Sequence, residues 1–275
     1  MAANIQDAIM LFGDSLTEGS WKYFGIAARL SHMYGRTFDV LNRGFSGYNT
    51  EWALPVFEQV FAKQHEQHHA PRVRLLLIWF GANDACLPLS RQHVPLARFG
   101  ENLAAMIRMI TSPTSPHYSP ETKILLLTPP PVSPVLWGAE LATHDPPGEQ
   151  DRAVESSREY AAEVERVGQR EGVPVVDVWN KVWDAAGKDE KGLERFLYDG
   201  LHLNDEGYKI VFDELVAAIT QHYFELQYEQ LQYVFPPWRY FFDHTVEEFK
   251  AERWVHREHP VPAADASAAA SSSPE

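Results

Sequence analysis

Short apolar runs alternate along this chain with longer segments in which apolar residues recur at the spacing of a helix. The runs have the length of buried strands and occupy residues 9–12, 38–44, 73–80, 123–128 and 173–178. The longer segments predict helices over residues 21–34, 51–67, 99–110, 151–171 and 205–219. Residues 133–150, which are rich in proline, are predicted to form a long loop that is functional or mobile.

The alternation of strands with helices determines the fold class. Successive strand–helix–strand units place the strands in a parallel sheet with helices on both faces. We therefore predict an α/β protein, a three-layer α/β/α sandwich around a central parallel sheet of about five strands. The domain is expected to cover residues 1–220. An aromatic-rich helical extension packed on it is expected over residues 221–259, and a disordered tail rich in Ala, Ser and Pro over residues 260–275.

Composition and charge narrow the range of functions. The 275 residues carry a net charge of −14, whereas nucleic-acid-binding proteins show a basic surface, so nucleic acid is excluded as the main partner. No run of about 18 apolar residues is present, so no stable membrane insertion is predicted. The amino terminus lacks the features of a signal peptide, and the single cysteine, Cys86, has no disulfide partner within the chain. Together these features favour a cytoplasmic protein.

The first predicted strand ends at a candidate nucleophile. Residues 9–12 are followed by Gly13, Asp14 and Ser15. Gly13 permits a tight turn, and the segment from Leu16 can begin a helix. Ser15 would then be exposed at the corner between strand and helix, at the sheet edge where open α/β proteins bind their ligands. A plain helix cap is the structural alternative for this serine.

Three further glycine-containing segments follow strands or lie in loops at the same predicted edge. They are Arg43-Gly44-Phe45-Ser46-Gly47, Gly81-Ala82-Asn83-Asp84 and Asp199-Gly200-Leu201-His202. With Gly13-Asp14-Ser15-Leu16 they resemble, in order, the four sequence blocks of the GDSL or SGNH hydrolases, a superfamily of serine esterases and lipases. The resemblance spans residues 13–202 and leaves the aromatic extension and the tail uncovered. It implies the flavodoxin-like fold of that superfamily.

The resemblance also implies roles for individual residues. Ser15 would attack an ester carbonyl and form an acyl-enzyme, and His202 would take its proton and return it to the leaving alcohol. Asp199 would orient the imidazole, which its position three residues earlier on one tight loop allows. The oxyanion hole would consist of the backbone N–H groups of Ser15 and Gly47 and the side-chain amide of Asn83. Ordinary turns are the alternative for Gly47 and Asn83, and loop polarity or half a metal site for Asp199 and His202.

Within the superfamily, the chain is similar to the isoamyl acetate-hydrolysing esterases of fungi and other eukaryotes. The similarity rests on the short segment before the first block, the variant Gly81-Ala82-Asn83-Asp84-Ala85 and the acidic sequence without a signal peptide. It implies small acetate esters of alcohols as substrates. An acyl or alcohol pocket is predicted from apolar residues that could instead belong to the core: Trp21, Phe80, Leu87, Leu136 and Trp137. No cofactor or metal is expected, because the histidines at 65, 68 and 69 have no second ligand cluster.

Other activities on the same scaffold stay open. A carbohydrate O-deacetylase, a lysophospholipase or an acyl-thioesterase would carry the same four blocks. A nucleotide-binding module is disfavoured, because the chain contains neither G-x-G-x-x-G nor a P-loop sequence. A non-catalytic scaffold that binds a partner through the aromatic extension is a remoter alternative, and the same extension is a candidate homodimer contact.

Overall fold

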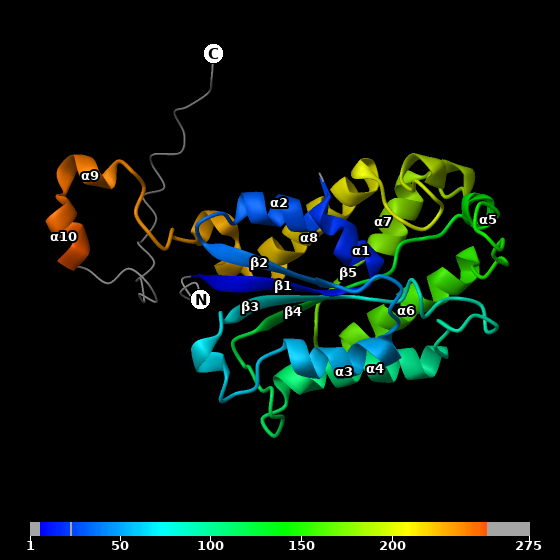
Figure 1. The fold of residues 1–275 in the computed structure, drawn as a ribbon, viewed down its shortest axis with the longest axis horizontal. Helices are drawn as coiled ribbons and strands as arrows, with labels where there is room; N and C mark the ends of the chain where they lie inside the picture. Colours follow the sequence, from blue (N-terminus) through cyan, green and yellow to red (C-terminus); the bar gives the residue numbers. More distant parts are fainter. Residues whose placement is uncertain (1–5, 23, 252–275) are drawn as a thin grey trace, which may run out of the picture.

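Five parallel strands form one sheet in the computed structural model, which describes residues 6–22 and 24–251 (Figure 1). The order across the sheet is β2-β1-β3-β4-β5. The strands are β1 (Asp7–Gly13), β2 (Phe38–Gly44), β3 (Val73–Trp79), β4 (Lys123–Leu127) and β5 (Val175–Val176). Gly13 pairs with Gly44 of β2 and with Trp79 of β3, so the three strands end together at the carboxyl edge. The predicted parallel α/β fold is confirmed.

Helices cover both faces of this sheet, as the sandwich prediction requires (Figure 1). One face carries α2 (Ile26–Met33), α7 (Val178–Ala185) and α8 (Asp205–His222). The opposite face carries α3 (Thr50–Val60), α4 (Leu96–Thr111) and α6 (Val154–Glu171). The remaining helices are α1 (Ser15–Glu18), α5 (Pro134–Leu141), α9 (Tyr240–Asp243) and α10 (Val246–Ala251). Short 3₁₀ turns span Gly19–Trp21, Gln67–His69, Lys191–Arg195, Phe224–Leu226 and Tyr228–Gln230.

The strands contribute side chains to two hydrophobic cores, one on each face of the sheet, because successive side chains of a strand point to opposite faces. Ile9 and Leu11 belong to the core beneath α2, α7 and α8, whereas Met10 and Phe12 belong to the core beneath α3, α4 and α6. Both faces are therefore dry. This explains why the central strands are almost continuously hydrophobic rather than alternating.

The predicted loop at residues 133–150 is wrong in its first half, which forms α5. The Ser133 hydroxyl accepts a hydrogen bond from the Leu136 N–H at 3.4 Å, and Pro134 occupies the first helical position. Serine followed by proline is a helix-start signal, because proline has no N–H to leave unpaired there. The high proline content of the segment concealed that signal. The Ser133 N–H also donates to Gly200 O at 2.8 Å, which ties the start of α5 to the Asp199–His202 loop.

Other predicted elements are also shorter in the structure, including the helix predicted over residues 21–34, which is limited to α2. The strand predicted over residues 173–178 is limited to β5, because the Asp177 carboxylate accepts the Asn180 N–H and caps α7. Helix α7 itself was not predicted. The helix predicted over residues 51–67 ends at Val60, where Phe61 takes extended backbone angles. At the end of β5 the boundary is set by Asp177, whose side chain caps α7.

The chain after α8 turns back over the amino edge of the sheet. The Tyr34 hydroxyl donates to Leu226 O at 2.9 Å, and the Arg36 guanidinium donates to Phe235 O and Pro236 O at 2.9 and 2.8 Å. Beyond this point α9 and α10 stand away from the sandwich, at the end opposite to α5 (Figure 1). Residues 252–259 of the predicted extension and the predicted tail at 260–275 lie outside the described residues. Among the described helices, none combines the length and apolarity needed to cross a membrane.

Candidate active site

A steric constraint creates the corner at which Ser15 lies. A Cβ on Gly13 would lie 2.1 Å from the Thr17 hydroxyl and 2.5 Å from Trp79 O, so only glycine fits between β3 and the first turn of α1. Asp14 is the helix cap, since its carboxylate accepts the Leu16 N–H at 2.9 Å. Ser15 is the first helical residue, and so the alternative that this serine merely caps the helix is wrong. Its hydroxyl is free to point elsewhere.

The Ser15 hydroxyl points to the His202 imidazole. Ser15 Oγ lies 2.8 Å from His202 Nε2, and His202 Nδ1 lies 2.5 Å from Asp199 Oδ2. A carboxylate accepts hydrogen bonds only, so the ring proton belongs on Nδ1, and Nε2 is left to accept the serine proton. We call Ser15, His202 and Asp199 the relay side of the site. This chain of hydrogen bonds can activate a hydroxyl nucleophile.

Asp199 is held by its own loop. Its Oδ1 accepts the backbone N–H groups of Leu201 and His202 at 2.9 and 2.7 Å. Burial raises the pKa of the Asp199 carboxyl, but the hydrogen bonds from the His202 side chain and backbone outweigh that effect and hold the pKa below its usual value. The carboxylate therefore stays charged and keeps the imidazole in one orientation.

Two loops from the neighbouring strands meet beside the nucleophile. Asn83, in the loop after β3, donates from Nδ2 to Tyr48 O at 2.9 Å. Gly47, in the loop after β2, has a φ of +78°, a conformation that favours glycine. Its carbonyl accepts a hydrogen bond from Gln92 Nε2 at 2.8 Å. No hydrogen bond in the described part of the chain uses the Gly47 N–H. That N–H and the second Nδ2 hydrogen of Asn83 are thus available as donors.

Two buried carboxyl groups, Asp84 and Asp14, lie under this edge of the sheet, and Asp84 joins two of its segments. Asp84 Oδ1 accepts the Thr50 N–H at 2.9 Å and the Thr50 hydroxyl at 2.5 Å, which joins the β3 loop to the start of α3. Burial raises the pKa of Asp84 to about 7 and that of Asp14 to about 6. One oxygen of each group is enclosed and has no hydrogen-bond partner among the described residues. Each group thus accepts a backbone N–H from the first turn of a helix, Asp14 from α1 and Asp84 from α3.

Arg152, a residue that the sequence motifs do not indicate, lies beside Asn83 and belongs to the loop before α6. Its side chain is only 5% exposed. Nη2 donates to Asn83 Oδ1 at 3.2 Å, and Nη1 donates to Ala82 O. No motif marks this arginine, because it lies 69 positions after Asn83 and follows a proline-rich segment. We call Gly47, Asn83 and Arg152 the amide side of the site.

The predicted pocket residues separate into three groups. Leu136 and Trp137 are half-buried in α5, which packs against Gly200 of the Asp199–His202 loop. Trp21 and Leu87 are exposed. Phe80 lies in the core beneath α3, α4 and α6, where its ring contacts Phe12 at a centroid distance of 5.1 Å. Of the five predicted pocket residues, the structure therefore places Leu136 and Trp137 against the Asp199–His202 loop.

The chemistry available at this edge is that of a side-chain nucleophile with a base and hydrogen-bond donors. In residues 6–22 and 24–251, His, Cys, Asp and Glu side chains do not gather in groups of three or more that could hold a metal ion. Cys86 is buried, and burial raises the pKa of its thiol to about 11. A thiol in that state is a poor nucleophile at neutral pH.

Comparison with known proteins places this geometry in a family. Residues 11–210 match the model of the GDSL-like Lipase/Acylhydrolase family. The chain is 35% identical to the isoamyl acetate-hydrolyzing esterase 1 homolog of Bos taurus, over 84% of this chain and 86% of that protein. It is 30% identical to the isoamyl acetate-hydrolyzing esterase of Saccharomyces cerevisiae, over 85% and 94%. Among solved structures, a lipase/acylhydrolase from Enterococcus faecalis is similar at a TM-score of 0.55 and 25% identity, covering 82% of this chain and 98% of that one.

Proposed function

Since this chain belongs to the GDSL-like lipase/acylhydrolase family of carboxylic ester hydrolases, we propose that it hydrolyses short-chain, acetyl esters of small alcohols. The observation that carries the mechanism is the contact of 2.8 Å between Ser15 Oγ and His202 Nε2. The choice of acetyl esters is supported by the similarity to proteins named isoamyl acetate-hydrolyzing esterases, which extends over more than four fifths of the chain.

In the proposed reaction, Ser15 Oγ attacks the ester carbonyl while His202 Nε2 takes the hydroxyl proton. The tetrahedral intermediate collapses, His202 gives the proton to the departing alcohol, and the acyl group stays on Ser15. A water molecule then attacks the acyl-enzyme, again with His202 as base, and releases the acid. Asp199 holds the tautomer in which Nε2 accepts a proton and stabilises the imidazolium.

When Ser15 attacks, negative charge develops on the carbonyl oxygen of the substrate. Hydrogen-bond donors directed at that oxygen stabilise the charge. We assign this role to the Ser15 and Gly47 N–H groups and to Asn83 Nδ2. The support for this assignment is the position of all three at the ends of adjacent strands, together with the unused Gly47 N–H. Asn83 donates without bearing a charge, so it favours the oxyanion and leaves the basicity of His202 intact.

The test is hydrolysis of p-nitrophenyl acetate, butyrate and octanoate by the wild type and by Ser15→Ala. We expect acetate to be the best substrate and kcat to fall by about 10⁴-fold or more in Ser15→Ala. Ser46→Ala is the matched control, because Ser46 is exposed in a neighbouring loop and its backbone N–H, not its hydroxyl, donates to Glu18. Activity that survives in Ser15→Ala would overturn the mechanism. Serine-dependent activity that favours octanoate would keep the mechanism and replace the substrate class with lipids or thioesters.

Two wider predictions accompany this function, namely a cytoplasmic location and a homodimer formed through the aromatic extension. The dimer is motivated by large exposed side chains such as Phe224, Trp238 and Phe242. Sedimentation equilibrium of the full chain tests it, and a monomer at all concentrations would remove it. Imaging of the tagged chain in cells tests the location.

A further inference from the structure

A buried positive charge lies against the side chain proposed to bind the oxyanion. The Arg152 guanidinium donates to Asn83 Oδ1 at 3.2 Å and to Ala82 O, and it is 95% enclosed. Burying a charged group is costly unless strong partners replace water. Its hydrogen-bond acceptors are an amide oxygen and a backbone carbonyl, both neutral, while the Asp151 carboxylate lies 3.7 Å from Nε. The ion pair with Asp151 compensates the charge, but it does not account for the direction of Nη1 and Nη2 toward the loop after β3.

The contacts fix which way the Asn83 amide faces. Arginine can only donate and a backbone carbonyl can only accept. With Oδ1 toward Arg152 and Nδ2 toward Tyr48 O, both contacts are favourable. A flipped amide would set donor against donor at Arg152 and acceptor against acceptor at Tyr48. The contact with Tyr48 uses one Nδ2 hydrogen, so the arrangement leaves the other to the substrate.

Arg152 is itself held on two sides. Its guanidinium lies 5.0 Å from the centroid of the Trp137 ring, and its Nε lies 3.7 Å from Asp151 Oδ1. The same Asp151 oxygen accepts the Trp137 indole N–H at 2.8 Å. Asp151 also accepts the Leu87 N–H on its backbone oxygen at 2.7 Å. The clamp of Trp137, Asp151 and Arg152 therefore connects α5 and the loop after β3.

We infer that Arg152 is a positioning residue for ester hydrolysis, one that orients and polarises the Asn83 amide toward the oxyanion. A cation at an amide oxygen draws electron density from the nitrogen and strengthens its N–H as a donor, and the dry surroundings increase the effect. The benefit grows as negative charge develops on the substrate, so it acts on the transition state. This inference rests on the proposed function, because it assigns a supporting residue to the same oxyanion hole.

The competing explanation is that Arg152 only ties the start of α6 to the loop after β3. The two explanations differ in coupling. If Arg152 acts through Asn83, substituting it should have little effect on kcat once the Asn83 amide is absent. If Arg152 is only a structural tie, the substitution should lower kcat equally with and without that amide. A double-mutant cycle on catalysis therefore separates them.

The experiment measures kcat and KM for p-nitrophenyl acetate in the wild type, Arg152→Met, Asn83→Ala and the double variant. We expect Asn83→Ala to lower kcat by about 100- to 1000-fold. Arg152→Met should lower kcat by about 10- to 100-fold with KM nearly unchanged, since the lost interaction is made in the transition state. In the Asn83→Ala background the same change should cost less than about threefold. Arg158→Met is the matched control, because Arg158 is exposed on α6 and contacts the Trp179 ring away from Asn83.

Arg152→Lys supplies the same cycle if Arg152→Met does not fold, because lysine keeps the charge but cannot donate to Asn83 and Ala82 together. Equal losses in both Asn83 backgrounds would overturn the inference and leave the Ser15 mechanism standing. Loss of the folded state in both Arg152 variants, judged by circular dichroism, would assign Arg152 to stability and would also overturn it. Activity that persists in Ser15→Ala would instead remove the proposed function itself.

Discussion

On the relay side, the hydrogen bonds join side chains that lie partly at the surface, whereas on the amide side the side chains of Asn83 and Arg152 are enclosed. The side chains of His202 and Asp199 are 24% and 10% exposed. Asn83 and Arg152 are 2% and 5% exposed. The relay has to exchange protons with substrate and water, so it needs access. The amide side has to present fixed dipoles to a developing charge, and dipoles act most strongly where water is excluded.

The two sides also differ in how far along the chain their partners lie. Asp199 and His202 are three positions apart on one loop, and that loop alone orients the carboxylate. On the amide side, Asn83 depends on Arg152, 69 positions away, and on Tyr48, 35 positions away. A substitution on the relay side should therefore lower the rate of hydrolysis and leave the stability of the fold nearly unchanged. A substitution on the amide side should lower both the rate of hydrolysis and the stability of the fold.

Asp199→Asn gives the largest expected effect and sharpens the first half of this comparison. The backbone N–H groups of Leu201 and His202 both point at Oδ1, so the new amide must place its oxygen there and its NH₂ against His202 Nδ1. The imidazole is then forced to carry its proton on Nε2, where it cannot accept the Ser15 proton. We expect kcat to fall by about 10⁴-fold.

The measurement is steady-state hydrolysis of p-nitrophenyl acetate, with thermal unfolding followed in parallel. Asp205→Asn is the control, because it removes an exposed carboxylate three residues after His202 and should leave activity unchanged. If kcat for Asp199→Asn fell by less than about tenfold, the tautomer argument would be wrong and the relay would reduce to Ser15 and His202.

The same contrast explains what could be predicted from the sequence. The central strands were predictable, because their hydrophobic runs are long and face two helical layers. The pairing of Ser15 with His202 was implied by the resemblance of four short blocks to those of the hydrolases, three of which follow strands whose carboxyl ends parallel topology brings to one edge. Arg152 could not be predicted, because its role depends on a loop path that no local pattern specifies. The start of α5 is indicated in the sequence by Ser133 followed by Pro134, a signal that the high proline content of the segment obscures.

Asp84→Asn tests whether the amide side is as dry as its burial indicates. Burial raises the pKa of Asp84 to about 7, against about 3.9 for an unfolded aspartate. The folded state therefore holds this proton more tightly than the unfolded state. The resulting stability is fully present below pH 4 and is lost as the pH rises through 7. Asparagine does not titrate, and its Oδ1 can still accept from Thr50.

We expect the free energy of unfolding of the wild type to fall between pH 5 and pH 8 by about 2 kcal/mol more than that of Asp84→Asn. Urea denaturation at the two pH values measures this difference. Asp39→Asn is the control, because Asp39 is exposed on the edge strand β2. Identical pH dependence in the wild type and Asp84→Asn would show that water reaches the carboxyl, and the contrast between the two sides would weaken.

Tyr198→Ala gives the smallest expected effect and tests the openness of the relay side. The Tyr198 ring stacks on the His202 imidazole at a centroid distance of 5.6 Å and an interplanar angle of 16°, yet Tyr198 is 56% exposed. A ring pair contributes about 0.5–1.5 kcal/mol when it is well packed, and solvent exposure reduces that contribution. We therefore expect kcat/KM to fall by about threefold in Tyr198→Ala and to be retained in Tyr198→Phe.

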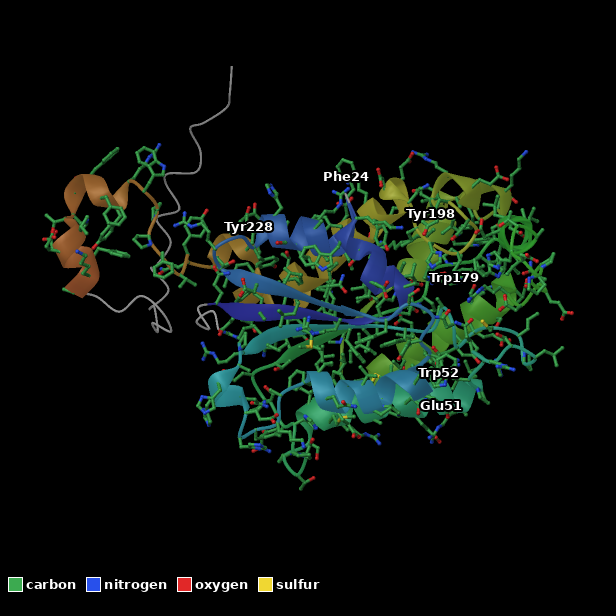
Figure 2. All side chains as sticks on the ribbon, viewed as in Figure 1. Phe24, Glu51, Trp52, Trp179, Tyr198 and Tyr228 are labelled. Atoms are coloured by element: carbon green, nitrogen blue, oxygen red, sulfur yellow. The ribbon has the colours of Figure 1, made fainter. Side chains whose placement is uncertain are left out.

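Tyr228→Ala is the matched control, because Tyr228 is an exposed tyrosine on the side of the sandwich away from Tyr198 (Figure 2). A loss of about 100-fold or more in Tyr198→Ala would mean that the imidazole depends on this ring as strongly as Asn83 is expected to depend on its buried partners. The relay side would then be a packed assembly rather than an open one. A small loss that only the aromatic replacement restores would instead support a relay held by the Asp199–His202 loop, with Tyr198 restricting ring rotation from the solvent side.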